Sequence, residues 1–164
     1  MDNPKVLIVI GSKSDLPVME EAAKVLAEMG ISHRITIASA HRTPEKAAKL
    51  ASEAREKGVK ILIAGAGFAA HLAGALAANT TLPVIGVPLP ASALSGFDAL
   101  LSTVQMPAGL PVATMAVGKA GARNAGILAA QMLSLSDDKL VGRLSDMRRE
   151  MAKDVEEADK ELQR

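Results

Sequence analysis

The stretch that decides the fold is Lys5–Asp15, "KVLIVIGSKSD", in which a run of aliphatic residues leads into a short polar loop. The run does not alternate between apolar and polar residues, which is typical of a strand buried on both faces of a parallel sheet. Residues 16–30 follow with apolar side chains at helical spacing and a stop at Gly30. A strand, a loop and a helix in this order indicate an α/β protein.

The same unit recurs along the chain. Further strands are predicted at 33–38, 59–65, 82–88 and 110–117, and further helices at 44–57, 66–79, 91–106 and 118–135. The second helix is expected to have Thr43 as its N-cap and Pro44 as its first residue. This alternation predicts a single domain over residues 1–164, with the α/β/α three-layer, flavodoxin-like fold and a doubly wound parallel sheet of order 2-1-3-4-5. Residues 137–164 predict a long charged C-terminal helix, either solvated or packed on a neighbouring subunit, and we expect the second.

Composition narrows the possible functions. The chain of 164 residues has no cysteine, which excludes disulfides and thiolate metal sites and suits a cytoplasmic protein. A net charge of +1 argues against nucleic-acid binding driven by bulk charge. No stretch is apolar enough to cross a membrane, and no signal peptide is visible. With two Phe and neither Trp nor Tyr, stacking of flavins or bases on aromatic side chains is not expected.

Three predicted loops carry the residues that could do chemistry. They are "GSKSD" (11–15), "SAHRTP" (39–44) and "AGAGF" (64–68). In the predicted strand order the first strand lies between the second and the third, so these loops meet at one edge of the sheet, where such folds bind ligands. The first loop offers the hydroxyls of Ser12 and Ser14 and free backbone N–H groups, which suit an anion. Asp15 either caps the next helix or faces sugar hydroxyls.

The other two loops complete the predicted pocket. His41 can exchange a proton near neutral pH, and the guanidinium of Arg42 suits a phosphate. Gly65 and Gly67 allow the backbone to approach a ligand closely, although Ala70 breaks the "GxGxxG" dinucleotide pattern. His71 is expected within the following helix, in a structural role rather than a catalytic one. The three histidines lack the spacing of metal ligands, so we expect no metal and no cofactor.

Taken together, these stretches resemble the class I PurE family of 5-(carboxyamino)imidazole ribonucleotide mutases, which act in purine (IMP) biosynthesis. The matching stretches extend from residue 11 to residue 131 in the order and spacing of the family: "GSKSD", "SAHRTP", "IAGAG", "AAHL", "ALSGFDALLSTVQMP" and "VGKAGARNAGILAAQ". The resemblance implies a homo-octamer in which each site is built from more than one subunit. The stretch "AAHL" favours class I over class II, whose members carboxylate aminoimidazole ribonucleotide with free CO2.

The resemblance also implies a reaction and a set of site residues. The reaction converts 5-(carboxyamino)imidazole ribonucleotide to 4-carboxy-5-aminoimidazole ribonucleotide by decarboxylation, trapping of CO2 and recarboxylation. By motif position, His41 would be the proton shuttle and Asp15 would bind the ribose hydroxyls. The substrate and its phosphate would be held by Ser12, Ser14, Ser39 and Arg42, and the CO2 enclosed by backbone at Ala66 and Gly67.

The third loop departs from the family pattern. It usually reads "AGAGGAAHLPG", whereas here Phe68 replaces a glycine and Ala73 a proline. We expect Phe68, together with Leu72, to modify the pocket. Two alternatives therefore stay open: a divergent carboxylase or decarboxylase that acts on another ribonucleotide, and a catalytically impaired scaffold. The joint presence of His41, Arg42 and Asp15 argues against the scaffold.

Overall fold

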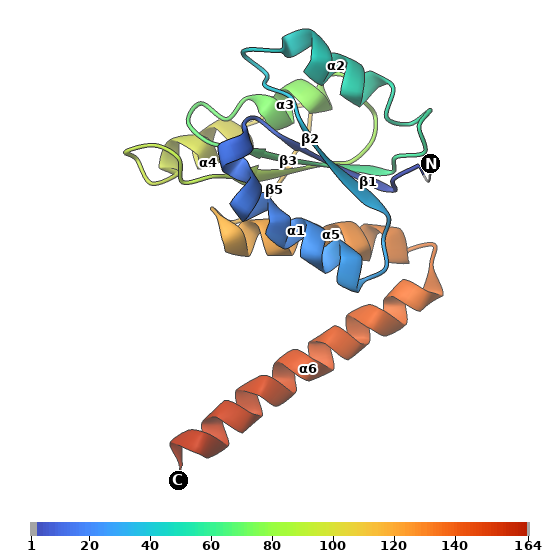
Figure 1. The fold of residues 1–164 in the computed structure, drawn as a ribbon, viewed down its shortest axis with the longest axis vertical. Coiled ribbons are helices and arrows are strands. Elements are labelled where there is room, and N and C mark those ends of the chain that lie inside the picture. Colours follow the sequence, from blue (N-terminus) through green and yellow to red (C-terminus); the bar gives the residue numbers. More distant parts are fainter. Residues whose placement is uncertain (1–2, 164) are drawn as a thin grey trace. The chain divides into compact units, whose positions relative to one another are not determined.

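The structure is a computed structural model that describes residues 3–163. The chain divides into two compact units, residues 1–129 and residues 130–164. In the first unit five strands form one parallel sheet of order β2-β1-β3-β4-β5 (Figure 1), which confirms the predicted fold class and strand order. The strands are β1 (Val6–Ile10), β2 (His33–Ile37), β3 (Ile61–Ala66), β4 (Val84–Pro88) and β5 (Ala113–Thr114).

Helices cover both faces of this sheet (Figure 1). Helices α2 (Pro44–Ser52) and α3 (Leu72–Ala77) lie on one face, and α1 (Leu16–Glu28) and the first part of α5 (Lys119–Ser134) lie on the other. The remaining helix of this unit is α4 (Phe97–Val104). Strand β1 is central and completely buried, and its last residue, Ile10, is paired with the ends of both β2 and β3. The loops that follow these three strands therefore meet at one edge of the sheet.

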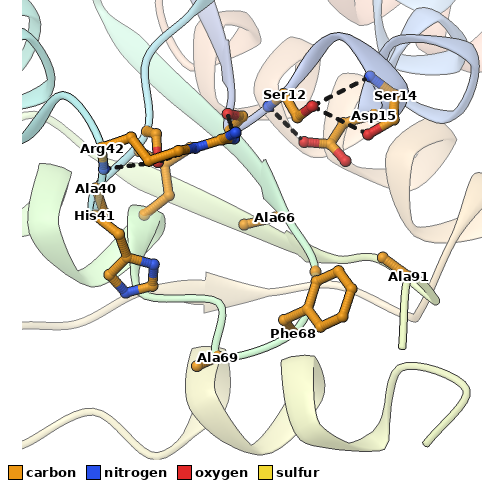
Figure 2. Close-up of a pocket in the computed structure, with 14 residues that line it drawn as sticks. Ser12, Ser14, Asp15, Ala40, His41, Arg42, Ala66, Phe68, Ala69 and Ala91 are labelled. Atoms are coloured by element: carbon orange, nitrogen blue, oxygen red, sulfur yellow. Dashed lines mark hydrogen bonds between the residues drawn. The ribbon is translucent and has the colours of Figure 1, made fainter. Parts of the chain in front are cut away.

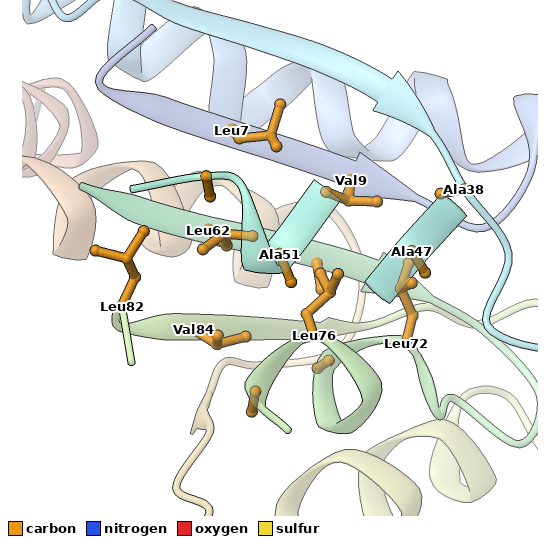
Figure 3. Packing of buried hydrophobic residues seen from close by; sticks show 14 of the residues in the cluster. Leu7, Val9, Ala38, Ala47, Ala51, Leu62, Leu72, Leu76, Leu82 and Val84 are labelled. Carbon is orange, nitrogen blue, oxygen red and sulfur yellow. The ribbon is translucent and has the colours of Figure 1, made fainter. Parts of the chain in front are cut away.

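The core is aliphatic and closely packed. Figure 3 shows the cluster between the sheet and helices α2 and α3, which includes the side chains of Leu7, Leu62 and Leu76. The buried residues that α2 contributes are Ala47 and Ala51, whose small side chains let this helix approach the strands closely. On the opposite face, a Cβ at Gly65 would lie 2.5 Å from the Sδ atom of Met19, so β3 and α1 are in contact at the glycine.

Several predicted elements are shorter than expected. The helix predicted at 66–79 is found only at 72–77, because Phe68 adopts a φ of 55° that no α-helix can include. The helix predicted at 44–57 ends at Ser52, and turns lead from there to Gly58, whose φ is +79°. Thr43 is the N-cap residue of α2 and Pro44 its first residue, as predicted, although the side chain of Thr43 makes no capping hydrogen bond. It binds Ser39 instead.

The second unit consists of the end of α5 and the long helix α6 (Asp138–Leu162). The carboxylate of Asp137 accepts a hydrogen bond of 3.1 Å from the N–H of Lys139 and so caps the start of α6. The predicted long C-terminal helix is therefore present. Its exposed apolar residues include Val141, Met151, Val155 and Leu162. None of the described helices has both the length and the hydrophobicity of a membrane-spanning segment.

Candidate active site

A cavity of about 540 Å³ lies where the loops after β1, β2 and β3 meet (Figure 2). All of the predicted site residues line it: Ser12, Ser14, Asp15, Ser39, His41, Arg42, Ala66, Gly67, Phe68 and Leu72. Gly11, Ala40, Ala69 and Ala91 line it as well. The cavity therefore combines hydroxyl, carboxyl, guanidinium and imidazole groups with a wall of small apolar residues.

The loop after β1 is shaped by a reciprocal cap. Ser12 begins a single 3-10 turn, Lys13–Asp15, and its hydroxyl oxygen accepts hydrogen bonds from both the N–H and the hydroxyl of Ser14. In return, the Oδ2 atom of Asp15 accepts a hydrogen bond of 2.8 Å from the N–H of Ser12. Asp15 stands at the N-cap position of α1, but its side chain makes no capping bond to this helix, so the alternative in which Asp15 only caps α1 is not supported. Its carboxylate is instead held at the cavity by the 3-10 turn.

Asp15 is the one buried acid of the cavity, with 8% of its surface exposed. Burial raises the pKa of its carboxyl, and the N–H groups of Ser12 and Gly11 and the charge of Arg42 oppose that effect. A carboxyl whose pKa is raised on folding stabilises the fold at low pH and loses that contribution as the pH rises through its folded value. Ionisation of this carboxyl therefore costs free energy of folding, a pattern common at functional sites.

The loop after β2 is built from hydrogen bonds. The hydroxyl oxygen of Ser39 accepts the N–H of Arg42 at 3.1 Å, and the hydroxyl of Thr43 binds both the N–H and the C=O of Ser39. The Nη2 atom of Arg42 donates to the C=O of Gly11 at 3.0 Å and so ties this loop to the loop after β1. The guanidinium retains further donors for an anion.

A second cavity, of about 390 Å³, adjoins this loop. Lys13, Arg42 and Lys46 line it together with hydroxyls of the first two loops. Lys46 was not among the predicted site residues, although its place in the first turn of α2, close after Arg42 in the sequence, could have indicated it. Three cations therefore gather beside the hydroxyls, and they favour a phosphate there.

The loop after β3 is held by close packing. The C=O of Ala66 accepts the N–H of Leu89 at 2.9 Å, which joins this loop to the loop after β4. A Cβ at Gly67 would lie 2.5 Å from the Cβ of Ala91, so only glycine fits at this contact. Ala91 was missed because only three loops were considered, although the predicted strand order already placed β4 beside β3. Backbone and methyl groups thus form the apolar wall.

His41 and His71 face each other although 30 positions separate them in the sequence. The Nε2 atom of His41 lies 2.5 Å from the Nδ1 atom of His71, and the rings meet edge to face with centroids 4.8 Å apart. One nitrogen must donate and the other accept, so the two tautomers are linked. His71 was expected inside a helix; it lies one residue before α3, in contact with the predicted proton shuttle.

Residues 5–154 of the chain match the family model described as AIR carboxylase. The chain belongs to the AIR carboxylase family. Among its relatives within this family is the N5-carboxyaminoimidazole ribonucleotide mutase of Bacillus subtilis, which is 51% identical over 97% of this chain and 98% of the relative. The enzymes of the same name from Escherichia coli K12 (94% and 92% covered) and Pyrococcus horikoshii (99% and 90% covered) are each 50% identical.

A solved structure shows the same fold. The crystal structure of Treponema denticola PurE superposes with a TM-score of 0.87 and covers 97% of this chain and 98% of its own, at 30% identity. Within residues 3–163, no three side chains of the kind that bind metals are grouped together. The residues that line the cavity can bind an anion and a sugar, and they can move a proton beside a small apolar wall.

Proposed function

We propose that the protein is the mutase that converts 5-(carboxyamino)imidazole ribonucleotide to 4-carboxy-5-aminoimidazole ribonucleotide. One observation carries the proposal: every residue that the family resemblance assigns to this reaction lines the same cavity. Relatives about half identical in sequence bear the name of this mutase, and they align over nearly the full chain. The protein is accordingly an isomerase, and its substrate is a small ribonucleotide.

The proposed binding mode follows from charge and hydrogen-bonding capacity. The phosphate binds Arg42 and the hydroxyls of Ser12, Ser14 and Ser39, where Lys13 and Lys46 add positive charge. The carboxylate of Asp15 accepts hydrogen bonds from the ribose hydroxyls. Phosphate and carboxylate repel each other, so the ribose lies between them. The heterocycle then reaches the part of the cavity that His41 and the apolar wall enclose.

The proposed chemistry needs one proton shuttle and one dry pocket. The bond between the exocyclic nitrogen and the carboxylate carbon breaks, its electrons stay on nitrogen, and His41 protonates that nitrogen. The CO2 is held against the backbone of Ala66 and Gly67, where small apolar groups exclude water. Ring carbon 4 then attacks the CO2 and loses its proton to His41, which restores the starting state. His71 positions the imidazole of His41 through their contact.

Phe68 and Ala73 motivated the alternatives of a divergent carboxylase and of an impaired scaffold. The relatives that match over nearly the whole chain are named as mutases, and nothing in the comparisons favours another reaction. A scaffold would not need a buried carboxylate on the same cavity as His41. The mutase is therefore the proposal that the observations support best.

We also propose that the protein works as a homo-octamer in the cytoplasm. Helix α4 presents Phe97, Leu101 and Val104 at the surface, and an apolar patch of this kind suits a contact between subunits. In α6, the apolar residues Val141, Leu144, Met151, Val155 and Leu162 follow steps of three and four residues or their sums, which is the pattern of a helix that packs along another helix. We propose that residues 137–164 pack on a neighbouring subunit.

The test is an assay of the purified protein with its substrate labelled with ¹³C in the carboxylate. The wild type should form the product and retain the label in the presence of excess unlabelled bicarbonate, because the CO2 stays trapped. His41→Asn should abolish turnover without changing the circular dichroism spectrum. His33→Asn is the matched control: this histidine begins β2, binds the C=O of Ile31 and lies outside the cavity.

Two results would contradict the proposal. Absence of turnover by the wild type would leave the scaffold and the enzyme that acts on another ribonucleotide. Loss of the label to the bicarbonate pool would instead indicate a carboxylase that uses free CO2.

A further inference from the structure

Phe68 is an exposed aromatic ring at the wall of the cavity. It is 61% exposed and lines the cavity beside Gly67, Ala69 and Leu72. Figure 2 shows the ring on the opposite side of the cavity from the imidazole of His41. Among the described residues, the one contact between aromatic rings is that of His41 with His71, so Phe68 stacks on no ring of its own subunit. The ring therefore contributes little buried surface and no ring contact to the folded subunit.

The position of the ring is fixed by a strained backbone. Phe68 and Ser95 are the two described non-glycine residues with a positive φ, and a bulky side chain is rare in this conformation. The loop cannot relax toward the loop after β4, because Gly67 already touches Ala91 and the C=O of Ala66 is bonded to Leu89. On the other side, the N–H of His71 binds the C=O of Ala69 at 2.8 Å. Strain retained at a cavity wall points to a role in the site.

We propose that the phenyl ring of Phe68 is the surface against which the imidazole ring of the substrate packs, so that Phe68 selects ligands that carry a planar heterocycle. This inference rests on the proposed function, which brings the heterocycle between His41 and the apolar wall. A phenyl face and an imidazole face attract each other in offset or edge-to-face geometry. The expectation from composition, that no aromatic surface serves the ligand, is thereby revised.

The test compares two ligands that differ only in the heterocycle. Isothermal titration calorimetry measures the affinity of 4-carboxy-5-aminoimidazole ribonucleotide and of ribose 5-phosphate for wild type, Phe68→Leu and Phe68→Tyr. Phe68→Leu should weaken the ribonucleotide about tenfold and leave ribose 5-phosphate unchanged. Phe68→Tyr keeps the ring and should keep the affinity. Leu135→Ala is the control, because Leu135 is 89% exposed and lies outside both the cavity and the proposed subunit contacts.

The possible results distinguish the proposed role of Phe68 from the proposed mutase function. Equal weakening of both ligands, or no weakening of the ribonucleotide, would overturn the role of Phe68. A change in the oligomer mass of Phe68→Leu, measured by light scattering, would also overturn it, because the ring would then belong to a subunit contact. Turnover by the wild type without any effect of Phe68→Leu would overturn this inference alone. If Phe68→Leu selectively weakens ribonucleotide binding but the wild type shows no turnover, the proposed mutase function alone is overturned. If the wild type does not bind the ribonucleotide, both proposals are overturned.

Discussion

Two loops of the site are built by different physical means. The loop after β2, residues 38–43, is held by hydrogen bonds of Ser39, Arg42 and Thr43. The loop after β3, residues 67–71, is held by contact between Gly67 and Ala91 and contains the strained Phe68. A hydrogen-bonded loop can exchange one bond for water at modest cost, whereas a close-packed loop cannot move at all without displacing its neighbour.

The difference matches the tasks of the two loops in the proposed reaction. In the loop after β2, the polar groups hydrogen-bond to one another and also offer donors to a phosphate. The same groups can therefore both fix the conformation of this loop and bind the ligand. A pocket for CO2 must offer few hydrogen bonds and exclude water, so the loop after β3 depends mainly on close packing, beside the few hydrogen bonds of Ala66 with Leu89 and of His71 with Ala69. His41 belongs to the first loop and His71 to the second, so their contact joins the two.

The largest expected effect concerns the close-packed loop. Gly67→Ala places a methyl group 2.5 Å from the Cβ of Ala91 and should lower the free energy of unfolding by about 2–3 kcal/mol, measured by urea denaturation. Ala91→Gly removes the opposing methyl group, so the double variant should recover most of the loss. Gly142→Ala is the control, because a Cβ there meets no atom within 4 Å. Failure of Ala91→Gly to rescue would show that shape does not hold this loop.

The next effect concerns the contact between the loops. His71→Ala should lower kcat about tenfold with little change in KM, because the imidazole of His41 loses its fixed orientation while the substrate keeps its contacts. His71→Asn retains a donor and acceptor near the position of Nδ1 and should restore much of kcat. A structural role alone would instead lower the midpoint of thermal unfolding for both variants and leave kcat intact in the folded fraction.

The sequence was informative to a different degree for each loop. Continuous aliphatic strands and loop residues of distinctive type predicted the sheet order and the polar groups on the cavity, including His41 and Arg42. The contact of Gly67 with Ala91 could not be predicted, because it depends on a distance between two backbones rather than on either residue. The prediction of a helix over 66–79 was wrong at its start because it too depended on a contact distant in the sequence. The small residues favour a helix locally, but packing against the loop after β4 prevents one there.

A smaller effect is expected for the hydrogen-bonded loop. Thr43→Val removes a hydroxyl that accepts the N–H of Ser39 at 2.8 Å and donates to its C=O at 3.2 Å. Because Thr43 is exposed and water can replace the lost bonds, the free energy of unfolding should fall by only about 1 kcal/mol. Thr43→Ser keeps the hydroxyl and should stay close to wild type in the same urea titration. If Thr43→Val lowers the free energy of unfolding as much as Gly67→Ala does, the two loops do not differ in how they are stabilised.

The smallest effect, and the one of opposite sign, concerns the strained residue. Phe68→Gly removes a side chain from a backbone with a φ of 55°, which should gain about 1–2 kcal/mol. The freer unfolded chain offsets about 0.5–1 kcal/mol of this gain, so the variant should be roughly 0.5–1 kcal/mol more stable than wild type. Ser95→Gly, at a φ of 52°, reports the backbone effect without a ring. If Ser95→Gly is stabilised and Phe68→Gly is destabilised, the phenyl ring contributes contacts to the folded protein, and its retention would not require a ligand.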